Sequence, residues 1–173
     1  MPHEVAEITE VVVKEFGIPV GIHSHDDTGV GVANALASIL AGSTQVQGTI
    51  NGYGERVGNC NLTTVIPNLQ LTMNRPMVAD ISKLSHMASF VDDLANCAHN
   101  IRAPYVGATA FAHKGGMHVN AVQKVAHSFE HVTPETVGNK QRILVSELSG
   151  QSNVLMKAEE LGLPVEKGSE EAL

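Results

Sequence analysis

Apolar residues recur at spacings of three and four along two segments near the N-terminus. In residues 4–16 this pattern predicts an amphipathic helix, which Gly17 is placed to end and Pro19 follows. In residues 30–41, which are rich in Ala, the same pattern predicts a second helix with Gly42 as its C-terminal cap. We therefore expect two helices that each bury one face.

Short apolar runs separate these helices from each other and from the next helical pattern. Residues 20–22 form one such run and lead directly into the polar segment 23–28. Residues 44–50 contain alternating apolar positions, and a loop over residues 51–59 precedes helical spacing in residues 62–69. The order helix, strand, helix, strand, helix is typical of βαβ units in a parallel sheet, so we predict an α/β fold.

The pattern changes after Pro76. Asp80 is a candidate N-cap for a longer helix whose apolar positions run from Ile81 to Leu94, and we place a domain boundary near residue 75. Two strands cannot close a barrel, so the chain is either a fragment of a larger enzyme or a small open unit that pairs with partners. We favour the fragment, because a barrel of alternating strands and helices needs about 250 residues.

The C-terminal part of the chain has weaker patterns. Residues 98–120 contain several His and Gly residues, residues 121–127 can form a helix, and residues 142–148 can form a short strand. A turn over residues 149–153 then leads to a terminal helix. We expect the tail, residues 166–173, to be disordered.

Composition and charge exclude several classes of protein. With 43% apolar residues the chain can bury a core, and an aromatic content of only 3% favours closely packed helices and parallel strands over a β-sandwich. The net charge of −7 and the scattered Lys and Arg residues argue against nucleic-acid binding. Because no apolar run approaches the roughly 18 residues of a membrane span and no signal-peptide pattern is present, we expect a cytoplasmic protein without membrane contact. Cys60 and Cys97 are isolated, which favours reduced structural thiols.

Two histidines follow the first predicted strand. Side chains alternate between the faces of a strand, so His23 and His25 point the same way, and both imidazoles can reach one metal ion. Ligands of parallel α/β folds bind at this carboxyl end of the strands. The alternative is a pair of solvated histidines on a loop. Asp26 and Asp27 can orient the imidazoles or cap the next helix, and we expect at least one of them to cap.

The loop after the second predicted strand supplies further polar groups. Its glycines, including Gly54, allow the backbone to approach a ligand, and Glu55, Arg56 and Asn59 offer polar side chains. Adjacent strands bring such loops together, so two imidazoles and oxygen ligands, including the Asn59 amide, can form one site for Mn²⁺, Mg²⁺ or Zn²⁺. Glu55 and Arg56 can instead form an ion pair that holds the loop, and we weigh this equally with substrate contact.

These segments together resemble a known family. The 2-isopropylmalate, homocitrate and citramalate synthases carry signatures similar to residues 20–33 (VGIHSHDDTGVGVA) and 51–59 (NGYGERVGN). They are metal-dependent enzymes that condense an acyl-CoA on a (β/α)8 TIM barrel. The resemblance implies that residues 1–75 are the C-terminal portion of the TIM-barrel catalytic domain. Residues 76–173 would then form a mainly helical linker subdomain.

The resemblance also implies which residues bind the metal. His23, His25 and Asn59 match ligands of the family, whose fourth ligand, an Asp of the first barrel strand, has no counterpart in this chain. The residues expected to contact substrate or organise the loops are Asp27, Gly54, Glu55 and Arg56.

A third similar segment covers residues 110–118. In the family its final His reaches into the active site, which implies a catalytic role for His118. From the sequence alone, this residue is more readily explained as a packed helical side chain. Asn139 aligns with a Tyr that works with this His in some synthases. Residues 137–153 most resemble the citramalate synthase branch.

The implied reaction is a metal-assisted Claisen condensation of acetyl-CoA with an α-keto acid, followed by thioester hydrolysis. With pyruvate as the acceptor the product is citramalate, on the route to isoleucine, and 2-isopropylmalate or homocitrate synthase is the alternative.

A lyase or aldolase on the same barrel is a second enzyme class, which the Gly-Glu-Arg-x-Gly-Asn loop argues against. A third alternative is a non-catalytic structural module, which best describes the isolated 173 residues. Because open sheet edges invite pairing, we expect a homodimer.

Overall fold

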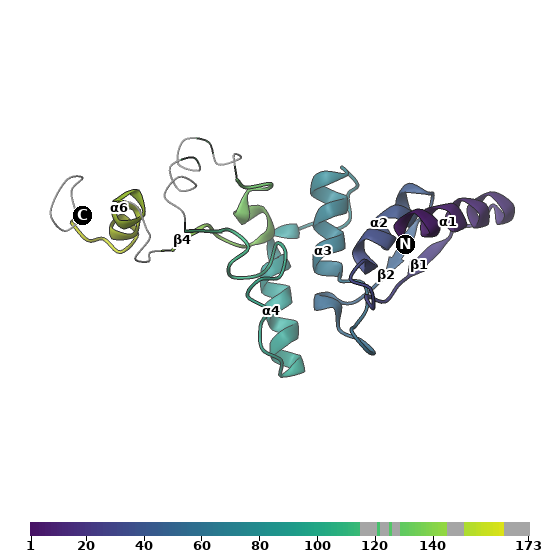
Figure 1. Ribbon diagram of the computed structural model, residues 1–173, viewed down its shortest axis with the longest axis horizontal. Coiled ribbons are helices and arrows are strands. Elements are labelled where there is room, and N and C mark those ends of the chain that lie inside the picture. The colour runs from purple at the N-terminus through teal and green to yellow at the C-terminus, as the bar shows by residue number, and fades with distance from the viewer. Residues whose placement is uncertain (115–120, 122–124, 126–128, 145–150, 165–173) are drawn as a thin grey trace. The chain divides into compact units, whose positions relative to one another are not determined.

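The computed structural model of the chain describes residues 1–114, 121, 125, 129–144 and 151–164 (Figure 1). The chain divides into two compact units, Met1–His99 and Asn100–Leu173. Most of the expected helix over residues 121–127 and the whole tail from residue 166 lie outside the described residues. Among the residues that the structure describes, no helix is long and apolar enough to cross a membrane.

The first unit alternates helices and strands as predicted. Its elements are α1 (Pro2–Phe16), β1 (Gly21–His23), α2 (Gly31–Leu40), β2 (Gln45–Gln47), the 3-10 turn η1 (Ile50–Gly52), α3 (Leu62–Pro67), the π-helical turn η2 (Asn68–Thr72), the 3-10 turn η3 (Ile81–Lys83) and α4 (Leu84–Ala95). Strands β1 and β2 are parallel, with Ile22 opposite Val46. The predicted α/β arrangement is confirmed, and within the described residues these strands form an open sheet that closes no barrel.

Helix α1 ends as the sequence predicts and packs against α2 (Figure 1). Gly17 caps it in the left-handed conformation, with a φ of 61°. A chain of buried hydroxyl groups links the two helices: the Thr9 Oγ1 lies 3.0 Å from the Ser38 Oγ, which lies 2.6 Å from the Ser43 Oγ. This contact places α1 against the Ala-rich helix that follows the candidate site.

Strand β2 is shorter than the predicted strand over residues 44–50, because the backbone changes partner after Gln47. The Thr49 N–H donates to the Cys60 carbonyl at 3.1 Å, and the Leu62 N–H donates to the Thr49 carbonyl at 2.9 Å. A Cβ added to Gly48 would lie 2.3 Å from the Cys60 carbonyl oxygen, so only glycine permits this approach. The returning segment around Cys60 therefore continues the sheet where β2 ends.

The core of the first unit joins α2, α3 and the returning segment. Its buried members are Ala35, Ile39, Cys60, Val65 and Leu69. Burial raises the pKa of the Cys60 thiol, which fits the prediction of a structural rather than reactive cysteine.

The single helix predicted over residues 62–69 changes character at its end. Pro67 closes α3, and the following turn, η2, is π-helical. Proline has no N–H to continue the ladder and its ring crowds the preceding turn, which accounts for the widened turn. The Asp80 cap is confirmed, since its carboxylate accepts a hydrogen bond from the Ser82 N–H at 3.0 Å.

The second unit has a small sheet of its own. Its elements are β3 (Ala112–His113), the 3-10 turn η5 (Pro134–Val137), β4 (Arg142–Ile143) and α6 (Gln151–Glu160). β3 and β4 are parallel. The turn predicted through residue 153 is wrong, because α6 already begins at Gln151. Its Asn153 donates to the carbonyls of Lys114 and Leu144 just beyond the two strands, which places the helix start there.

The Ser38→Ala substitution tests the buried hydroxyl chain. It leaves the Ser43 hydroxyl buried without this partner, so we expect the chain to lose about 1–3 kcal/mol of unfolding free energy in urea titrations. The control Ser89→Ala removes an exposed hydroxyl from α4 and should change stability by less than about 0.5 kcal/mol. Equal effects of the two substitutions would show that the hydroxyl chain does not hold α1 against α2.

Candidate functional site

The structure brings His23 and His25 together at the end of β1. Their Nε2 atoms lie 3.4 Å apart, and the rings meet edge to face at 71°. Two nitrogens bound at about 2.1 Å to one ion lie about 3.0–3.4 Å apart, so the spacing fits two ligands of the same cation. Because two N–H groups cannot point at each other, at least one of the facing atoms presents a lone pair.

Asn59 lies next to this pair through backbone pairing. It forms an antiparallel bridge with His25. The Asp26 N–H donates to the Gly58 carbonyl at 3.1 Å, and the Cys60 N–H donates to the Ser24 carbonyl at 2.9 Å. The returning segment thus carries Asn59 directly to the histidine loop.

Two buried polar atoms at this point have no hydrogen-bond partner among the described residues. They are the Asn59 Oδ1 and the His25 Nδ1. Leaving a buried acceptor unpaired costs about 1–3 kcal/mol, so such atoms indicate that a further group belongs here. An amide oxygen beside two imidazoles is a donor set that divalent cations accept.

The donor set that the described residues supply is incomplete for a metal. Within the described part of the chain, no three His, Cys, Asp or Glu side chains converge on one point. The site residues are two imidazoles and one amide, so a bound ion would need other ligands from water, substrate or another part of a protein.

Glycines pack tightly around Asn59. A Cβ on Gly54 would lie 2.2 Å from the Asn59 Nδ2, and a Cβ on Gly58 would lie 2.0 Å from the Gly52 carbonyl oxygen. Gly58 also has a φ of 106°. The sequence predicted that these glycines let the backbone approach a ligand. In the structure Gly54 lets the backbone approach the Asn59 side chain, and Gly58 lets it approach the Gly52 carbonyl.

Arg56 joins the two loops. Its guanidinium binds both carboxylate oxygens of Asp27, at 2.7 and 2.9 Å. Arg56 thus pairs with Asp27 and not with Glu55, so the alternative of an ion pair between Arg56 and Glu55 is wrong. The hydrogen bond from Arg56 lowers the pKa of the Asp27 carboxyl below its usual range. Both side chains are about half exposed, so the pair organises the loops more than it stabilises the fold.

Asp26 fulfils the predicted capping role. Its Oδ1 accepts a hydrogen bond from the Gly31 N–H at 2.7 Å, at the start of α2. Asp26 therefore fixes where the helix begins relative to the histidines, while Asp27 is engaged by Arg56. Glu55 is exposed on the other loop, next to Arg56.

The remaining predicted residues lie in the second half of the chain. His118 is outside the described residues. Asn139 donates to the carbonyls of Tyr105 and Gly107, both at 2.9 Å, and its Oδ1 accepts from Arg142 at 3.0 Å. In this unit Asn139 fastens backbone segments together.

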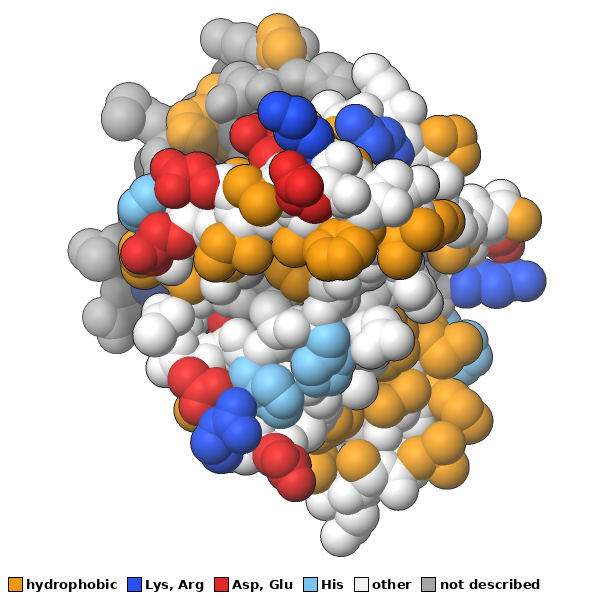
Figure 2. Space-filling model, turned by 90° about the vertical axis from the view of Figure 1, so that its right-hand side faces the viewer, with side chains coloured by type: hydrophobic (Ala, Val, Ile, Leu, Met, Phe, Trp, Pro, Cys, Tyr) orange, Lys and Arg blue, Asp and Glu red, His pale blue; other side chains and the backbone are white. Residues whose placement is uncertain are grey.

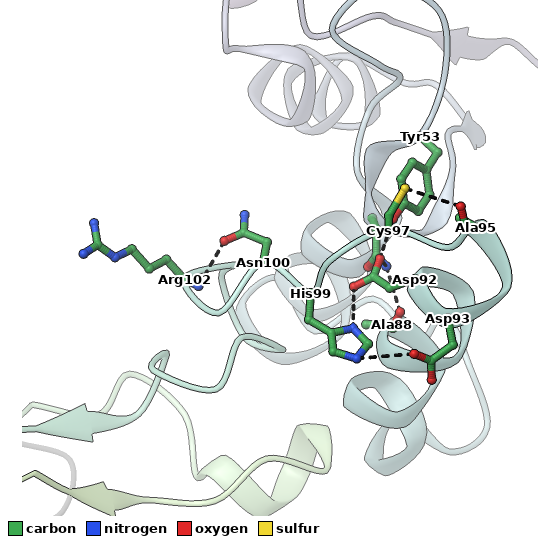
Figure 3. A network of polar contacts seen from close by, with 10 residues as sticks. Tyr53, Ala88, Asp92, Asp93, Ala95, Cys97, His99, Asn100 and Arg102 are labelled. Carbon is green, nitrogen blue, oxygen red and sulfur yellow. Dashed lines mark hydrogen bonds and ion pairs between the residues drawn. The ribbon is translucent and has the colours of Figure 1, made fainter.

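A polar network around Asp92 was not predicted (Figure 3). The Asp92 Oδ1 accepts hydrogen bonds from the Tyr53 hydroxyl at 2.7 Å and from the Asn51 amide, and its Oδ2 lies 3.0 Å from the His99 Nδ1. Burial alone would raise the pKa of Asp92, but the hydrogen bonds from Tyr53, His99 and Asn51 outweigh it and lower the pKa. The carboxylate is therefore ionised at neutral pH.

One sequence signal could have indicated this network. Leu84, Ala88 and Asp92 follow one another at intervals of four along α4, and all three are buried. An acidic residue on the apolar stripe of a helix needs partners. Two of its partners, Asn51 and Tyr53, lie 41 and 39 positions earlier, and no regular spacing along the sequence reveals them.

Two protein-family models match this chain. The family model described as HMGL-like matches residues 1–91, more than half of the chain. The chain belongs to the HMGL-like family. A second model, homocitrate synthase post-HMGL domain-like, matches residues 105–172. The resemblance seen in residues 20–33 and 51–59 is thereby confirmed.

Individual relatives of this HMGL-like chain extend the match. It is 49% identical to the (R)-citramalate synthase of Geobacter sulfurreducens over 96% of this chain and 32% of that protein. It is 48% identical to the (R)-citramalate synthase of Aquifex aeolicus over 99% of this chain and 33% of that protein. The chain thus spans about a third of the length of these curated relatives.

A solved structure supports the fold. The N-terminal domain of a putative aldolase from Bacteroides vulgatus superimposes with a TM-score of 0.50 and 26% identity, over 56% of this chain and 31% of that chain. More than half of the chain therefore has the local fold of part of a known solved protein.

The Gly58→Ala substitution tests the packing of the loop around Asn59. The left-handed backbone and the overlap with the Gly52 carbonyl should together cost roughly 3 kcal/mol or more in urea unfolding. In the control Gly29→Ala, φ is also positive, at 71°, but no atom lies within 4 Å of the added Cβ, so we expect about 1 kcal/mol. A cost for Gly58→Ala no larger than for Gly29→Ala would mean that the loop does not depend on this close contact.

Proposed function

We propose that this chain is part of an (R)-citramalate synthase-type enzyme, which condenses acetyl-CoA with pyruvate and hydrolyses the thioester. The observation that carries the proposal is the pair of imidazoles 3.4 Å apart beside the buried, unpartnered Asn59 Oδ1. The names of two relatives that match nearly the whole chain at 48–49% identity support pyruvate as the acceptor. 2-Isopropylmalate and homocitrate synthesis are the alternatives.

In this proposal His23, His25 and Asn59 hold a divalent cation, Mn²⁺, Mg²⁺ or Zn²⁺. When bound, such a cation supplies Lewis-acid polarisation of the keto carbonyl. The fit rests on the spacing of the two Nε2 atoms and on the Asn59 Oδ1, which accepts no other hydrogen bond in the described residues. A fourth protein ligand would come from outside this chain.

The other residues have separate tasks. Asp27 and Arg56 tie the histidine loop to the Asn59 loop, and Gly54 leaves room for the Asn59 amide. His118, matched by the resemblance alone, is proposed to move a proton as general acid or base, because imidazole titrates near neutral pH. Glu55 is exposed beside Arg56, where it is available to substrate.

The assignment of domains extends the proposal. Residues 1–75 would be the C-terminal portion of a TIM barrel, and residues 76–173 the linker subdomain that follows it. Large hydrophobic side chains on and just after α1 are exposed, and a band of hydrophobic side chains crosses the face drawn in Figure 2. Such a surface supports the idea that further strands and helices cover it. The expected homodimer stays a prediction.

Acceptor specificity is tested on the complete enzyme with acetyl-CoA and, in parallel, pyruvate, 2-oxoisovalerate and 2-oxoglutarate. We expect thiol release with pyruvate to exceed that with either other acid by at least about tenfold in kcat/KM, since pocket contacts to one side chain are worth about 1–3 kcal/mol. Preference for 2-oxoisovalerate or 2-oxoglutarate would replace citramalate by the corresponding alternative. The 173-residue chain alone should release no thiol above background.

The roles of the histidines are separated by metal titration of the complete enzyme. His25→Ala should weaken Mn²⁺ binding by more than about 100-fold, because loss of a ligand exceeds the 10–100-fold effect of an outer partner. His118→Ala should lower kcat by about 100-fold or more and leave Mn²⁺ binding within threefold. His86→Ala, an exposed histidine of α4, is the control for both. Unchanged Mn²⁺ binding in His25→Ala would remove the proposed metal site.

A further inference from the structure

The Tyr53 carbonyl determines how Asn59 is oriented. It accepts hydrogen bonds from the Asn59 Nδ2 at 2.9 Å and from the Thr49 Oγ1 at 2.5 Å. A carbonyl can only accept, so the nitrogen end of the Asn59 amide must face it, and the Oδ1 is the end left unpartnered. The direction of the proposed ligand atom therefore depends on where the Tyr53 backbone lies.

The backbone just before Tyr53 passes through the left-handed region. Asn51 and Gly52 both have positive φ angles, 60° and 75°, within the turn η1. Only glycine adopts this region without cost, and Asn does so less readily. A turn of this kind persists when surrounding contacts determine it.

Asp92 supplies such contacts from α4 (Figure 3). One carboxylate oxygen accepts from the side chains of both Asn51 and Tyr53, and the Asn51 amide also donates to the Ala88 carbonyl at 2.8 Å. One helix thus holds the side chain of Asn51, within the turn, and that of Tyr53, just after it. The side chain of Asp92 is only 10% exposed, whereas that of its neighbour Asp93 is 72% exposed.

The Tyr53 hydroxyl donates to Asp92, and the Asp92 carboxylate accepts, over the whole neutral pH range. The hydrogen bond to Asp92 strongly raises the pKa of the Tyr53 phenol, so its hydroxyl stays a donor throughout the neutral range. Hydrogen bonds to an ionised acceptor are roughly twice as strong as those between neutral groups. His99 engages the other carboxylate oxygen, which leaves the first for the turn.

We propose that Asp92 is a positioning residue for the metal site: through Asn51 and Tyr53 it sets the carbonyl that turns the Asn59 Oδ1 towards the cation. This inference rests on the proposed function of Asn59 as a ligand. Asp92 lies after the HMGL-like match at residues 1–91 and before the post-HMGL match at residues 105–172. The orientation of a ligand in the first segment is thus controlled from the stretch between the two.

The test measures Mn²⁺ affinity of the complete enzyme from the electron paramagnetic resonance signal of free Mn²⁺. Asp92→Ala should raise the dissociation constant 10–100-fold, the range of outer partners of metal ligands. Tyr53→Phe removes one hydroxyl and keeps the rest of the turn, so we expect a smaller rise in the dissociation constant, about 3–10-fold, below the range for loss of the whole carboxylate. Asp93→Ala removes the same charge one residue away and a contact of 3.5 Å to the His99 Nε2, but it leaves the Asn51 and Tyr53 contacts of Asp92 in place, so it should stay within twofold.

Kinetics separate positioning from general damage. If Asp92 acts through the metal, saturating Mn²⁺ should restore most of kcat in Tyr53→Phe, while the thermal unfolding temperature stays close to that of the parent enzyme. Should Asp92→Ala fail to fold, Tyr53→Phe alone decides. Parent-like Mn²⁺ affinity in Tyr53→Phe, or an equal effect of Asp93→Ala and Asp92→Ala, overturns the inference.

Asn59→Ala tells the two proposals apart. If it weakens Mn²⁺ binding while Asp92→Ala and Tyr53→Phe do not, the metal site stands and the role of Asp92 falls. If neither Asn59→Ala nor His25→Ala weakens binding, the proposed metal site fails, and the positioning role fails with it.

Discussion

The close passage of the returning segment between the ends of β1 and β2 is the constraint on which the first unit depends. Cys60 pairs through its N–H with Ser24 and through its carbonyl with Thr49, so one residue connects the loop after each strand. This passage requires Gly48 to lack a side chain and brings Cys60 into the core. It also leaves no freedom in where Asn59 meets His25, because their backbones are bridged.

The site divides into parts held in different ways. Backbone pairing fixes the position of Asn59, whereas its rotation depends on the Tyr53 carbonyl and so, in our proposal, on the Asp92 side chain more than 30 residues later. His23, in contrast, ends a strand and needs only the alternation of that strand to face His25. A site built in this way can lose the direction of one proposed ligand, Asn59, while the two histidines stay in place.

Sequence reasoning succeeded where the determining contacts are local. Spacing of apolar residues predicted α1 and α2, Gly17 and Asp80 marked a helix end and a helix start, and strand alternation placed His23 beside His25. It failed where a distant partner decides. Strand β2 ends early because Thr49 pairs with the Cys60 carbonyl. Arg56 pairs with Asp27, from the other loop, and not with its sequence neighbour Glu55. Asp92 contacts Tyr53, which lies 39 positions earlier. The membership of His118 in any site rests on resemblance alone.

The contact between Arg56 and Asp27 has a consequence for how the loops respond to solution conditions. Its charges are half exposed, so dissolved ions compete with it, with a screening length of about 8 Å at physiological ionic strength and about 3 Å at 1 M. The bridge between His25 and Asn59 consists of backbone hydrogen bonds and is far less sensitive to salt. Concentrated salt therefore weakens the contact between Arg56 and Asp27 on the exposed side of the two loops, while the backbone pairing between His25 and Asn59 stays in place.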